Sequence, residues 1–371
     1  MEFLQDLTYK IAISLIPGIG PITARTLIAY TGSAEFAIHE KEKSLLKIPG
    51  IGEINAQRIA AAQNDALNQA KREVDFIAKH QIRTYFYLDD NYPVRLKGCN
   101  DAPIIFYYKG NADLNESRII SVVGTRNATN HGKEICDDMI RKFSEQNYRV
   151  LVISGLAYGI DVQAHKSCLK YNMPTIGVLA HGLDTIYPSL HASIAHKMLE
   201  NGGLLSDFPS ETKIDRQNFL RRNRIIAGLA DATIIIESAE KGGALVTADI
   251  ANSYNRDVFA FPGRSSDVYS RGCNKIIKFN EAVLVENQAD IEKAMSWDIK
   301  VNPPKAVQTS LFVELTLEEQ KLVDLLKSKE HFVDEITFET KLPMSKVSAL
   351  LLGLEFKGLV VSLPGKMYRL K

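Results

Sequence analysis

The amino-acid sequence predicts an α/β fold in which a central parallel sheet is flanked by a helical module and a smaller C-terminal unit. Between residues 118 and 286, short apolar runs alternate with segments of helical periodicity. Near-continuous apolar strands joined by helices are typical of a parallel sheet covered on both faces. Residues 1–65 have a helical pattern with an internal near-repeat, and residues 311–371 follow a linker, 296–310, that contains Pro303 and Pro304. A chain of 371 residues also exceeds one ordinary core, which favours two or three domains.

Composition describes a soluble globular protein without an overall basic coat. Hydrophobic residues make up 45% of the chain and charged residues 24%, and the net charge is +1. Because the net charge is close to zero, any basic surface for binding nucleic acid must be a local patch. There is no apolar run long enough for a transmembrane helix and no signal-peptide pattern, so we expect a cytoplasmic protein without membrane insertion. The scattered Cys99, Cys136, Cys168 and Cys273 predict buried thiols, not a disulfide set or zinc site.

The near-repeat in residues 1–65 consists of Ile-Pro-Gly-Ile-Gly at 16–20 and again at 48–52, each followed four positions later by alanine. Each copy would end one helix and open the next, which is the helix-hairpin-helix pattern. In such a turn the glycines let backbone N–H groups approach a phosphate at a helix N-terminus. We therefore expect a secondary DNA contact at Gly18, Gly20, Gly50 and Gly52, the alternatives being a docking role or a turn that only packs.

Residues 70–295 are predicted to form the main α/β domain. Two strands are expected at 82–88 and 104–108, in a transitional region that contains turn residues. The core strands are expected at 118–123, 150–153, 175–179, 233–236, 258–261 and 282–285.

The tail, residues 311–371, is predicted to be a winged-helix-like domain. Helices are expected at 317–326 and around 347–354, and strands at 358–361 and 367–370 flank Pro364 and Gly365 as a hairpin. Helices followed by such a ribbon fit a winged helix. DNA binding and protein docking are both common uses of that fold, and both stay open.

Glycine-bearing loops follow four of the core strands and begin at Gly124, Ser154, Ala180 and Glu237. In parallel sheets, ligands bind at the carboxyl ends of the strands, and the helix N-termini that follow favour anions. A single glycine after a strand is often only a turn, but four such loops predict a phosphate-binding edge. Its expected contacts are Gly124, Thr125, Arg126, Ser154, Gly155, Gly242, Gly243 and Thr247.

The usual cofactor signatures are missing from these loops. The sequence has neither a G-x-G-x-x-G fingerprint nor a Walker lysine motif, so NAD and ATP are disfavoured. Asp161, His165, His181 and Asp184 could form acid–base pairs, but helix caps and loop hydrogen bonds are the more ordinary use of such residues. We therefore expect no cofactor, no metal and no catalytic residue.

Positive charge is concentrated at residues 216–224, where Arg221, Arg222 and Arg224 lie close to Phe219 and to the upstream Arg216. An apolar helical face follows them. Guanidinium groups beside a ring that can stack on a base are what a phosphate- and base-gripping surface needs. The expected contacts here are Arg216, Phe219, Arg222, Asn223 and Arg224.

Several long motifs, in order along nearly the whole chain, resemble the DNA-processing protein A family (DprA/Smf). They include residues 123–126, 154–161, 222–228, 242–247 and 261–263. The resemblance implies an extended Rossmann-like domain that binds single-stranded DNA and forms a homodimer. It also implies loading of the RecA recombinase during natural transformation, with variable flanking modules.

The family's DNA pocket corresponds to Arg126 in the G-[ST]-R loop and to a basic residue three positions before a phenylalanine, here Arg216 and Phe219. That basic residue is often lysine in relatives, so arginine keeps the charge but not the geometry. The two arginines would clamp phosphates and Phe219 would stack on a base. Arg222 and Arg224 could contact DNA directly, or could bind a carboxylate or carbonyls that hold the loops.

The leading hypothesis is a non-enzymatic protein that protects incoming single strands and delivers them to RecA. The runner-up is a nucleotide N-glycosidase-like enzyme of related Rossmann fold. Such enzymes carry a P-G-G-x-G-T-x-x-E loop, whereas residues 241–248 lack the leading proline, the third glycine and the glutamate. A double-strand-specific regulator acting through the winged helix would need a basic recognition helix, and residues 345–357 offer only Lys346 and Lys357.

Overall fold

The computed structural model describes residues 2–297, 315–327 and 329–371. The chain divides into two compact units, Met1–Gln288 and Ala289–Lys371, and helix α13 (Gln288–Ala294) begins at their boundary. Residues 298–310 of the predicted linker lie outside the described residues.

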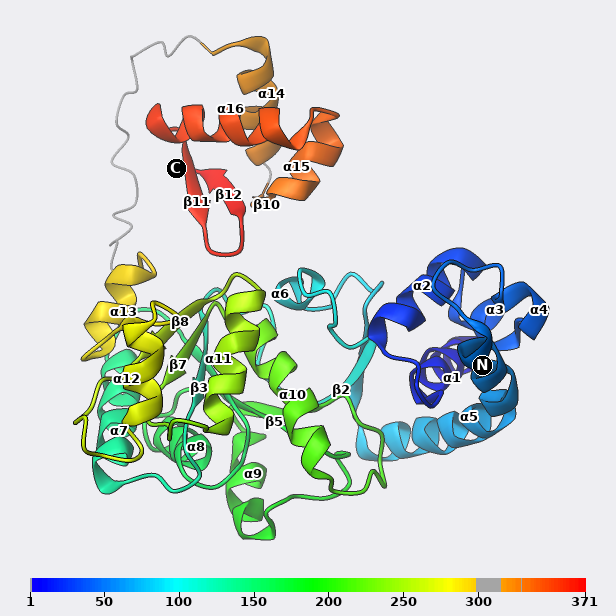
Figure 1. Cartoon of the computed structure of the whole chain (residues 1–371), viewed down its shortest axis with the longest axis horizontal. Coiled ribbons are helices and arrows are strands. Elements are labelled where there is room, and N and C mark those ends of the chain that lie inside the picture. The colour runs from blue at the N-terminus through cyan, green and yellow to red at the C-terminus, as the bar shows by residue number, and fades with distance from the viewer. Residues whose placement is uncertain (1, 298–314, 328) are drawn as a thin grey trace. The chain divides into compact units, whose positions relative to one another are not determined.

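The first unit begins with five helices, which lie together at one end of it (Figure 1). They are α1 (Glu2–Leu15), α2 (Pro21–Thr31), α3 (Ala34–His39), α4 (Glu42–Leu45) and α5 (Glu53–His80). Both Ile-Pro-Gly-Ile-Gly copies form the same turn. Gly18 and Gly50 have φ of +80° and +82°, a conformation that favours glycine, and Gly20 and Gly52 are the N-cap residues of α2 and α5. The repeat in the sequence is thus a repeat in backbone geometry.

The helical module and the edge of the sheet share one hydrophobic core. Ala70, Val74 and Ile77 of α5 belong to the same buried cluster as Ile105 and Tyr107 of the sheet. Helix α5 also continues without a break from Glu53 to His80, so the domain boundary predicted at residue 65 falls inside a helix. The module is therefore packed onto the α/β domain as part of one unit.

Within the described part of the chain, the α/β domain contains one nine-stranded sheet of order β1-β2-β6-β5-β4-β3-β7-β8-β9. The strands from β6 to β9 in this order are parallel to one another, whereas β2 pairs antiparallel with both β1 and β6. The strands are β1 (Arg83–Phe86), β2 (Ile105–Gly110), β3 (Ile119–Val123), β4 (Leu151–Ser154), β5 (Thr175–Val178), β6 (Gly202–Ser206), β7 (Ala232–Ile235), β8 (Asp257–Ala260) and β9 (Val283–Leu284).

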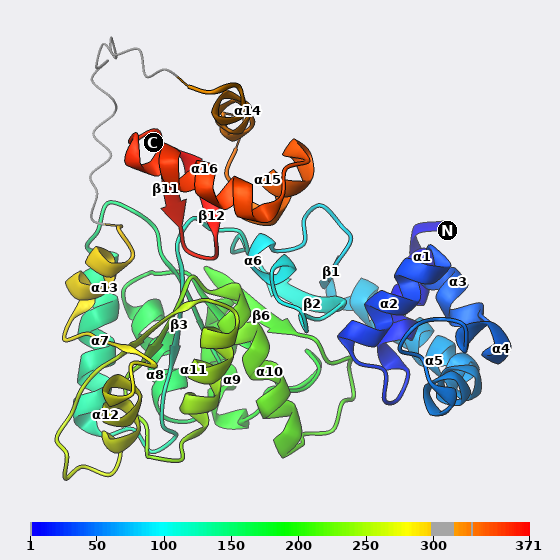
Figure 2. The same ribbon diagram turned by 45° about the horizontal axis from the view of Figure 1, so that its top comes forward.

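Helices cover both faces of this sheet, in the order expected for right-handed crossovers (Figures 1 and 2). One face carries α7 (Asn130–Ser144), α8 (Ile160–Lys170) and α9 (Ala192–Met198). The other carries α10 (Arg216–Leu229), α11 (Gly243–Ser253) and α12 (Arg271–Lys278). Two further short elements are α6 (Val94–Lys97) and the 3-10 turn η1 (Ser189–His191).

The strand order makes a topological switch at β3. From β3 the chain builds outward through β4, β5 and β6, and then returns to place β7 on the other side of β3. Ile120 of β3 pairs with Val152 of β4 on one side and with Ala232 of β7 on the other. In open α/β sheets, the loops that diverge at such a point leave a crevice that binds ligands. Here they are the loops that begin at Gly124 and Glu237.

The second unit is a small helical domain with an antiparallel ribbon. It contains α14 (Leu317–Leu326), α15 (Val333–Thr340) and α16 (Met344–Phe356), with a sheet of order β10-β12-β11. Its strands are β10 (His331–Phe332), β11 (Val360–Leu363) and β12 (Met367–Leu370). Leu322, Ile336, Val347, Leu351 and Leu354 fill its core. The architecture is that of the winged helix expected from the sequence, with α15 and β10 as elements that the sequence pattern did not predict.

Candidate nucleic-acid interface

A cavity of about 350 Å³ lies at the topological switch of the sheet. Its lining comes from the loop after β3 (Gly124, Thr125, Arg126), from the region after β4 (Ala157, Asp161), from α10 (Arg216, Phe219, Leu220, Arg222, Asn223, Ile226) and from the start of α11 (Gly242, Gly243, Ala244, Thr247). Most of the predicted DNA-contact residues therefore come together at one place. Ser154, Gly155 and Arg224 are not in the lining.

The loop after β3 is held by backbone hydrogen bonds to both neighbouring loops. The Thr125 N–H donates to the Glu237 carbonyl at 2.8 Å, and the Ile160 N–H donates to the Thr125 carbonyl at 3.2 Å. Gly159 has a φ of +80°, and a Cβ there would overlap the Thr125 carbonyl oxygen. The loop that presents Arg126 thus has a fixed path between β4 and β7.

Glu237 holds the same loop with its side chain, a role that the sequence analysis missed. Its carboxylate is buried and accepts hydrogen bonds from the Thr129 N–H at 2.9 Å and the Thr129 hydroxyl at 2.5 Å. Thr129 is the N-cap of α7, where a helix favours negative charge. The sequence does show a carboxylate immediately after a buried strand, which could have drawn attention to Glu237. The sequence alone does not show that its partner is Thr129.

Helix α10 presents Arg216, Phe219 and Asn223 to the cavity. The Asp215 carboxylate caps the helix by accepting from the Gln217 N–H at 2.7 Å, and Arg216 is exposed in the first turn. The Arg126 guanidinium carbon lies 5.4 Å from the centroid of the Phe219 ring, close enough for a cation–π contact. The cavity therefore joins two exposed cations and a partly exposed ring.

Tyr187 is a second aromatic residue beside the cavity that the sequence analysis did not select. Its ring centroid lies 6.0 Å from that of Phe219, with the planes at 65° in an edge-on arrangement. Tyr187 is 44% exposed and follows the loop after β5, residues 180–184, which was predicted to meet the other loops. Neither that loop nor Tyr187 is part of the lining of the cavity, and Tyr187 is linked to the cavity through its contact with the Phe219 ring.

Arg222 and Asp161 form the buried floor of the cavity. Arg222 is only 5% exposed and donates to the Val178 carbonyl. A Cβ at Gly155 would overlap both Asp161 and Arg222, so glycine at this position lets the two side chains approach the backbone. Burial lowers the pKa of Arg222 to about 10 and raises that of Asp161, although the positive charge of Arg222 opposes the second shift. Arg222 remains protonated at neutral pH.

Arg224 and Ser154 are used inside the fold. Arg224 is 8% exposed, forms an ion pair with Asp207 and donates to the Asp101 carbonyl. The Ser154 hydroxyl is buried and donates to the Val122 carbonyl at 2.6 Å. Both side chains therefore have partners inside the fold. For Arg224 these are a carboxylate and a carbonyl, as in the second of the two alternatives above, and DNA contact by either residue stays a prediction.

The histidines named in the sequence analysis are placed as structural groups. His165 is fully buried, with Nδ1 2.7 Å from the Thr175 hydroxyl, and burial lowers its pKa to about 3. His181 Nδ1 lies 2.9 Å from the Gly182 carbonyl oxygen. Across residues 2–297, 315–327 and 329–371, no group of three or more His, Cys, Asp or Glu side chains is placed to hold a metal ion.

The hairpin glycines lie away from this cavity. A Cβ at Gly20, Gly50 or Gly52 would meet open space, while the Arg58 side chain lies over Gly18. Arg25, which is near the first hairpin, instead donates to the Ala102 carbonyl at 3.1 Å. The hairpins thus form a separate candidate surface.

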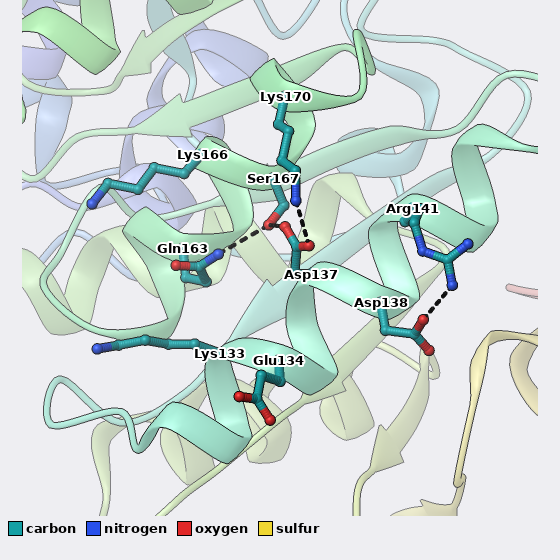
Figure 3. Close-up of a pocket in the computed structure, with 9 residues that line it drawn as sticks. All are labelled: Lys133, Glu134, Asp137, Asp138, Arg141, Gln163, Lys166, Ser167 and Lys170. Atoms are coloured by element: carbon teal, nitrogen blue, oxygen red, sulfur yellow. Dashed lines mark hydrogen bonds and ion pairs between the residues drawn. The ribbon is translucent and has the colours of Figure 1, made fainter.

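A further hollow of about 460 Å³ lies between α7 and α8 (Figure 3). Its Asp137 carboxylate accepts from the Ser167 hydroxyl at 2.7 Å and from Lys170 Nζ at 2.9 Å, and Asp138 pairs with Arg141 at 2.5 Å. Both aspartates thus already have partners, which lie on α8 for Asp137 and on α7 for Asp138. This hollow contains none of the glycine loops.

The fold and the cavity together define a class of protein, namely Rossmann-like proteins with a cavity at the carboxyl ends of the strands. The chain belongs to the DNA recombination-mediator protein A family, whose family model matches residues 83–296, and the DprA winged helix domain matches residues 306–366. These matches confirm the resemblance found in the sequence and the predicted fold class.

Two relatives illustrate the extent of the similarity. Protein Smf of Synechocystis sp. is 33% identical over 410 residues, covering 98% of this chain and 99% of the relative. The DNA processing protein DprA of Bacillus subtilis is 39% identical over 198 residues, covering 53% of this chain and 66% of the relative. The first alignment includes the terminal modules as well as the central domain.

Two solved structures are similar to the chain. DNA processing protein A from Streptococcus pneumoniae has a TM-score of 0.66 at 28% identity and covers 77% of this chain and 97% of its own. DNA processing protein A from Helicobacter pylori, described for its single-stranded DNA binding mode, has a TM-score of 0.53 at 25% identity and covers 59% and 97%. None of the helices in the described ranges is long and apolar enough to cross a membrane.

Proposed function

We propose that the chain binds single-stranded DNA in the cavity at the switch point, without catalysis, and that it protects incoming strands and loads RecA onto them during natural transformation. The observation that carries the proposal is the placement of Arg126, Arg216 and Phe219 around one cavity, beside glycine-rich helix N-termini. Exposed arginines and backbone N–H groups suit phosphates, and a ring can stack on any unpaired base. Family membership supports the RecA and transformation parts of the proposal.

The cavity favours a single strand over a duplex. A base can reach the Phe219 ring, between Arg126 and Tyr187, only if it is unstacked from its neighbours. Phosphate and stacking contacts carry little base information, so sequence preference is expected to be slight.

The enzymatic alternative is less well supported by the carboxylates near the cavity. Glu237 is occupied by two hydrogen bonds from Thr129, and Asp161 lies on the buried floor beside Arg222. The loop at 241–248 has no glutamate to serve the N-glycosidase chemistry. A nucleotide-hydrolysis assay with the wild-type protein serves as the control for this alternative.

We also propose a homodimer through the β9 edge of the α/β domain. β9 is the last strand of the sheet, and its Val283 and Leu284 are 56% and 46% exposed, with the exposed Phe279 close by in sequence. An apolar edge strand is a surface that a second copy can cover. A dimer could bind one DNA strand with both of its cavities, which would raise the avidity of the protein for DNA. A cytoplasmic location is supported by four cysteines that are free and buried.

The decisive experiment is a fluorescence anisotropy titration with a single-stranded oligonucleotide and a blunt duplex of the same length. We expect much tighter binding of the single strand, with an affinity that falls as salt rises because phosphate clamping releases counterions. Equal affinity for the two would overturn the cavity model. Light scattering at micromolar concentration tests the dimer, and RecA assembly on protected strands with and without the protein tests the hand-off.

A further inference from the structure

We propose that Glu73 of α5, the last helix of the N-terminal helical module (α1–α5), is a positioning residue for the end of α10 that carries Arg216 and Phe219, so that the module forms part of the single-strand site. This inference rests on the proposed function. The segment 207–215 connects β6 to α10, and it ends directly before Arg216. Ser210 lies six residues before Arg216, so a contact at Ser210 restricts the path by which the chain enters the first turn of α10, which carries Arg216 and Phe219.

The direct contact is a buried carboxylate that reaches from α5 to this segment. Glu73 is only 4% exposed, and its Oε2 accepts hydrogen bonds from the backbone N–H of Ser210, at 2.9 Å, and from the Ser210 hydroxyl. Buried carboxylates are rare unless they have partners, because their desolvation is costly. Burial accordingly raises the pKa of Glu73, while the two hydrogen bonds from Ser210 oppose that shift. A surface carboxylate that merely solubilised α5 would not be placed in this way.

A second contact joins the module to α10 from another direction. Arg25 of α2 donates to the carbonyls of Cys99 and Ala102, at 3.4 and 3.1 Å. Arg224 of α10 donates to the carbonyl of Asp101, within the same turn. The turn at 99–102 is therefore held by an arginine from the module on one side and by an arginine from the gripping helix on the other.

The two contacts leave little freedom between the module and α10. Helix α5 shares its core with the sheet edge, so Glu73 is part of a rigid support and not the tip of a mobile arm. Pre-organised contacts raise affinity by reducing the entropy lost on binding. Glu73 thereby acts on DNA through Arg216 and Phe219, without touching it. Arg126 is held separately, by the β4 and β7 loops, and serves as an internal comparison.

The test is a set of double-mutant cycles in single-strand affinity, measured on the full chain with a fluorescent oligothymidine. Glu73→Ala is expected to weaken binding about tenfold, or ~1.4 kcal/mol. Phe219→Ala and Arg216→Ala should then cost less in the Glu73→Ala background than in wild type, whereas Arg126→Ala should cost the same in both. Glu73→Gln, whose amide can still bond to Ser210, should bind close to wild type. Asp75→Ala, on the exposed side of the same helix, is the matched control.

The outcomes separate this inference from the proposed function. If Arg126→Ala and Phe219→Ala weaken binding while Glu73→Ala does not, or if every cycle is additive, the positioning role is wrong and the cavity stands. If the wild type does not prefer single strands, the proposed function itself fails. Should Glu73→Ala not fold, Ser210→Ala replaces it, because that variant keeps the backbone N–H partner of Glu73. It should then show the same coupling to Phe219, at about threefold.

Discussion

The strand-end cavity and helix α16 of the winged-helix domain both carry basic side chains, but they use them differently. In the cavity, Arg126 and Arg216 are exposed, and neither makes an ion pair with a residue in the described ranges. On α16 and at its end, Lys346 Nζ lies 2.5 Å from Glu318, and Lys357 Nζ lies 2.7 Å from Glu319. The arginines of the cavity are therefore available to a ligand, whereas the two lysines form ion pairs within their own domain.

The exposed surface of α16 also includes two large apolar side chains near its C-terminal end. Phe356 is 84% exposed and Leu352, one turn earlier, 53%. A recognition helix for duplex DNA would offer cations to phosphates and polar side chains to base edges. In a chain with a net charge of +1, a DNA-binding surface is therefore indicated by cations that have no acidic partner, and less by the number of cations.

The largest effect expected from this comparison lies within α10 itself. Arg224→Ala should lower the free energy of unfolding by about 3–5 kcal/mol, because it leaves the buried Asp207 carboxylate without its partner. The neighbouring Arg221 is exposed, and its guanidinium carbon lies 5.4 Å from the centroid of the Phe208 ring, so Arg221→Ala should cost about 1 kcal/mol or less. Urea unfolding followed by circular dichroism measures both. Equal losses would show that the burial of Arg224 does not govern its contribution.

The sequence partly indicates which arginines of α10 face the cavity and which do not. Positions 216, 219, 220, 223 and 226 recur at helical spacing, and all of them line the cavity. A helical periodicity applied to the arginines would have put Arg221 and Arg224 off that face. The partners of Arg224 could not have been found in this way, because Asp207 and Asp101 are distant in sequence and come together only through the fold.

Strand β6 shows what the apolar pattern could not predict. It reads Gly202-Gly203-Leu204-Leu205-Ser206, and glycine is depleted in strands. A Cβ at Gly202 would overlap the Thr175 carbonyl, so the glycine is required by a close approach of two backbones. The core strands with branched apolar residues were predicted correctly because burial on both faces leaves a continuous apolar run. The predicted strands also indicated the edge of the sheet at which the cavity lies. They did not indicate that the Glu237 carboxylate binds Thr129 and so holds the loop after β3.

The next effect concerns the free cations of the cavity. Arg126→Ala and Arg216→Ala should each weaken single-strand binding by about 1–3 kcal/mol, the scale of a lost charged hydrogen bond, with unfolding little changed. Lys197→Ala, an exposed cation on α9, is the matched control. Anisotropy titrations at two salt concentrations should show a smaller salt dependence for the arginine variants only. A cavity variant that binds like the control would remove that arginine from the clamp.

A further effect is expected from pH, through the buried His165. Its pKa is about 3 in the folded chain, against 6.5 for a free histidine. Below pH 6.5 the unfolded chain therefore takes up a proton that the folded chain does not, so this group's contribution to stability is complete above pH 6.5 and is lost as pH falls toward 3. Between pH 6.5 and 5 the loss should approach 2 kcal/mol, at ~1.4 kcal/mol per pH unit. Urea unfolding of His165→Gln should lack this slope, and a slope equal to wild type would assign the acid sensitivity elsewhere.

The smallest effect is expected where the comparison began, on α16. Lys346→Ala and Lys357→Ala remove cations that Glu318 and Glu319 already hold, with side chains that are 47% and 33% exposed. Partly exposed ion pairs contribute about 1 kcal/mol or less to stability, so each variant should unfold almost like wild type. Single-strand affinity should change by less than about twofold, since neither lysine is available to release a counterion. The same titrations with duplex DNA give the sharper test. A fall of tenfold or more in duplex affinity would mean that DNA displaces the glutamates from these lysines, and α16 would then be a DNA-reading helix whose charge is masked only in the free protein.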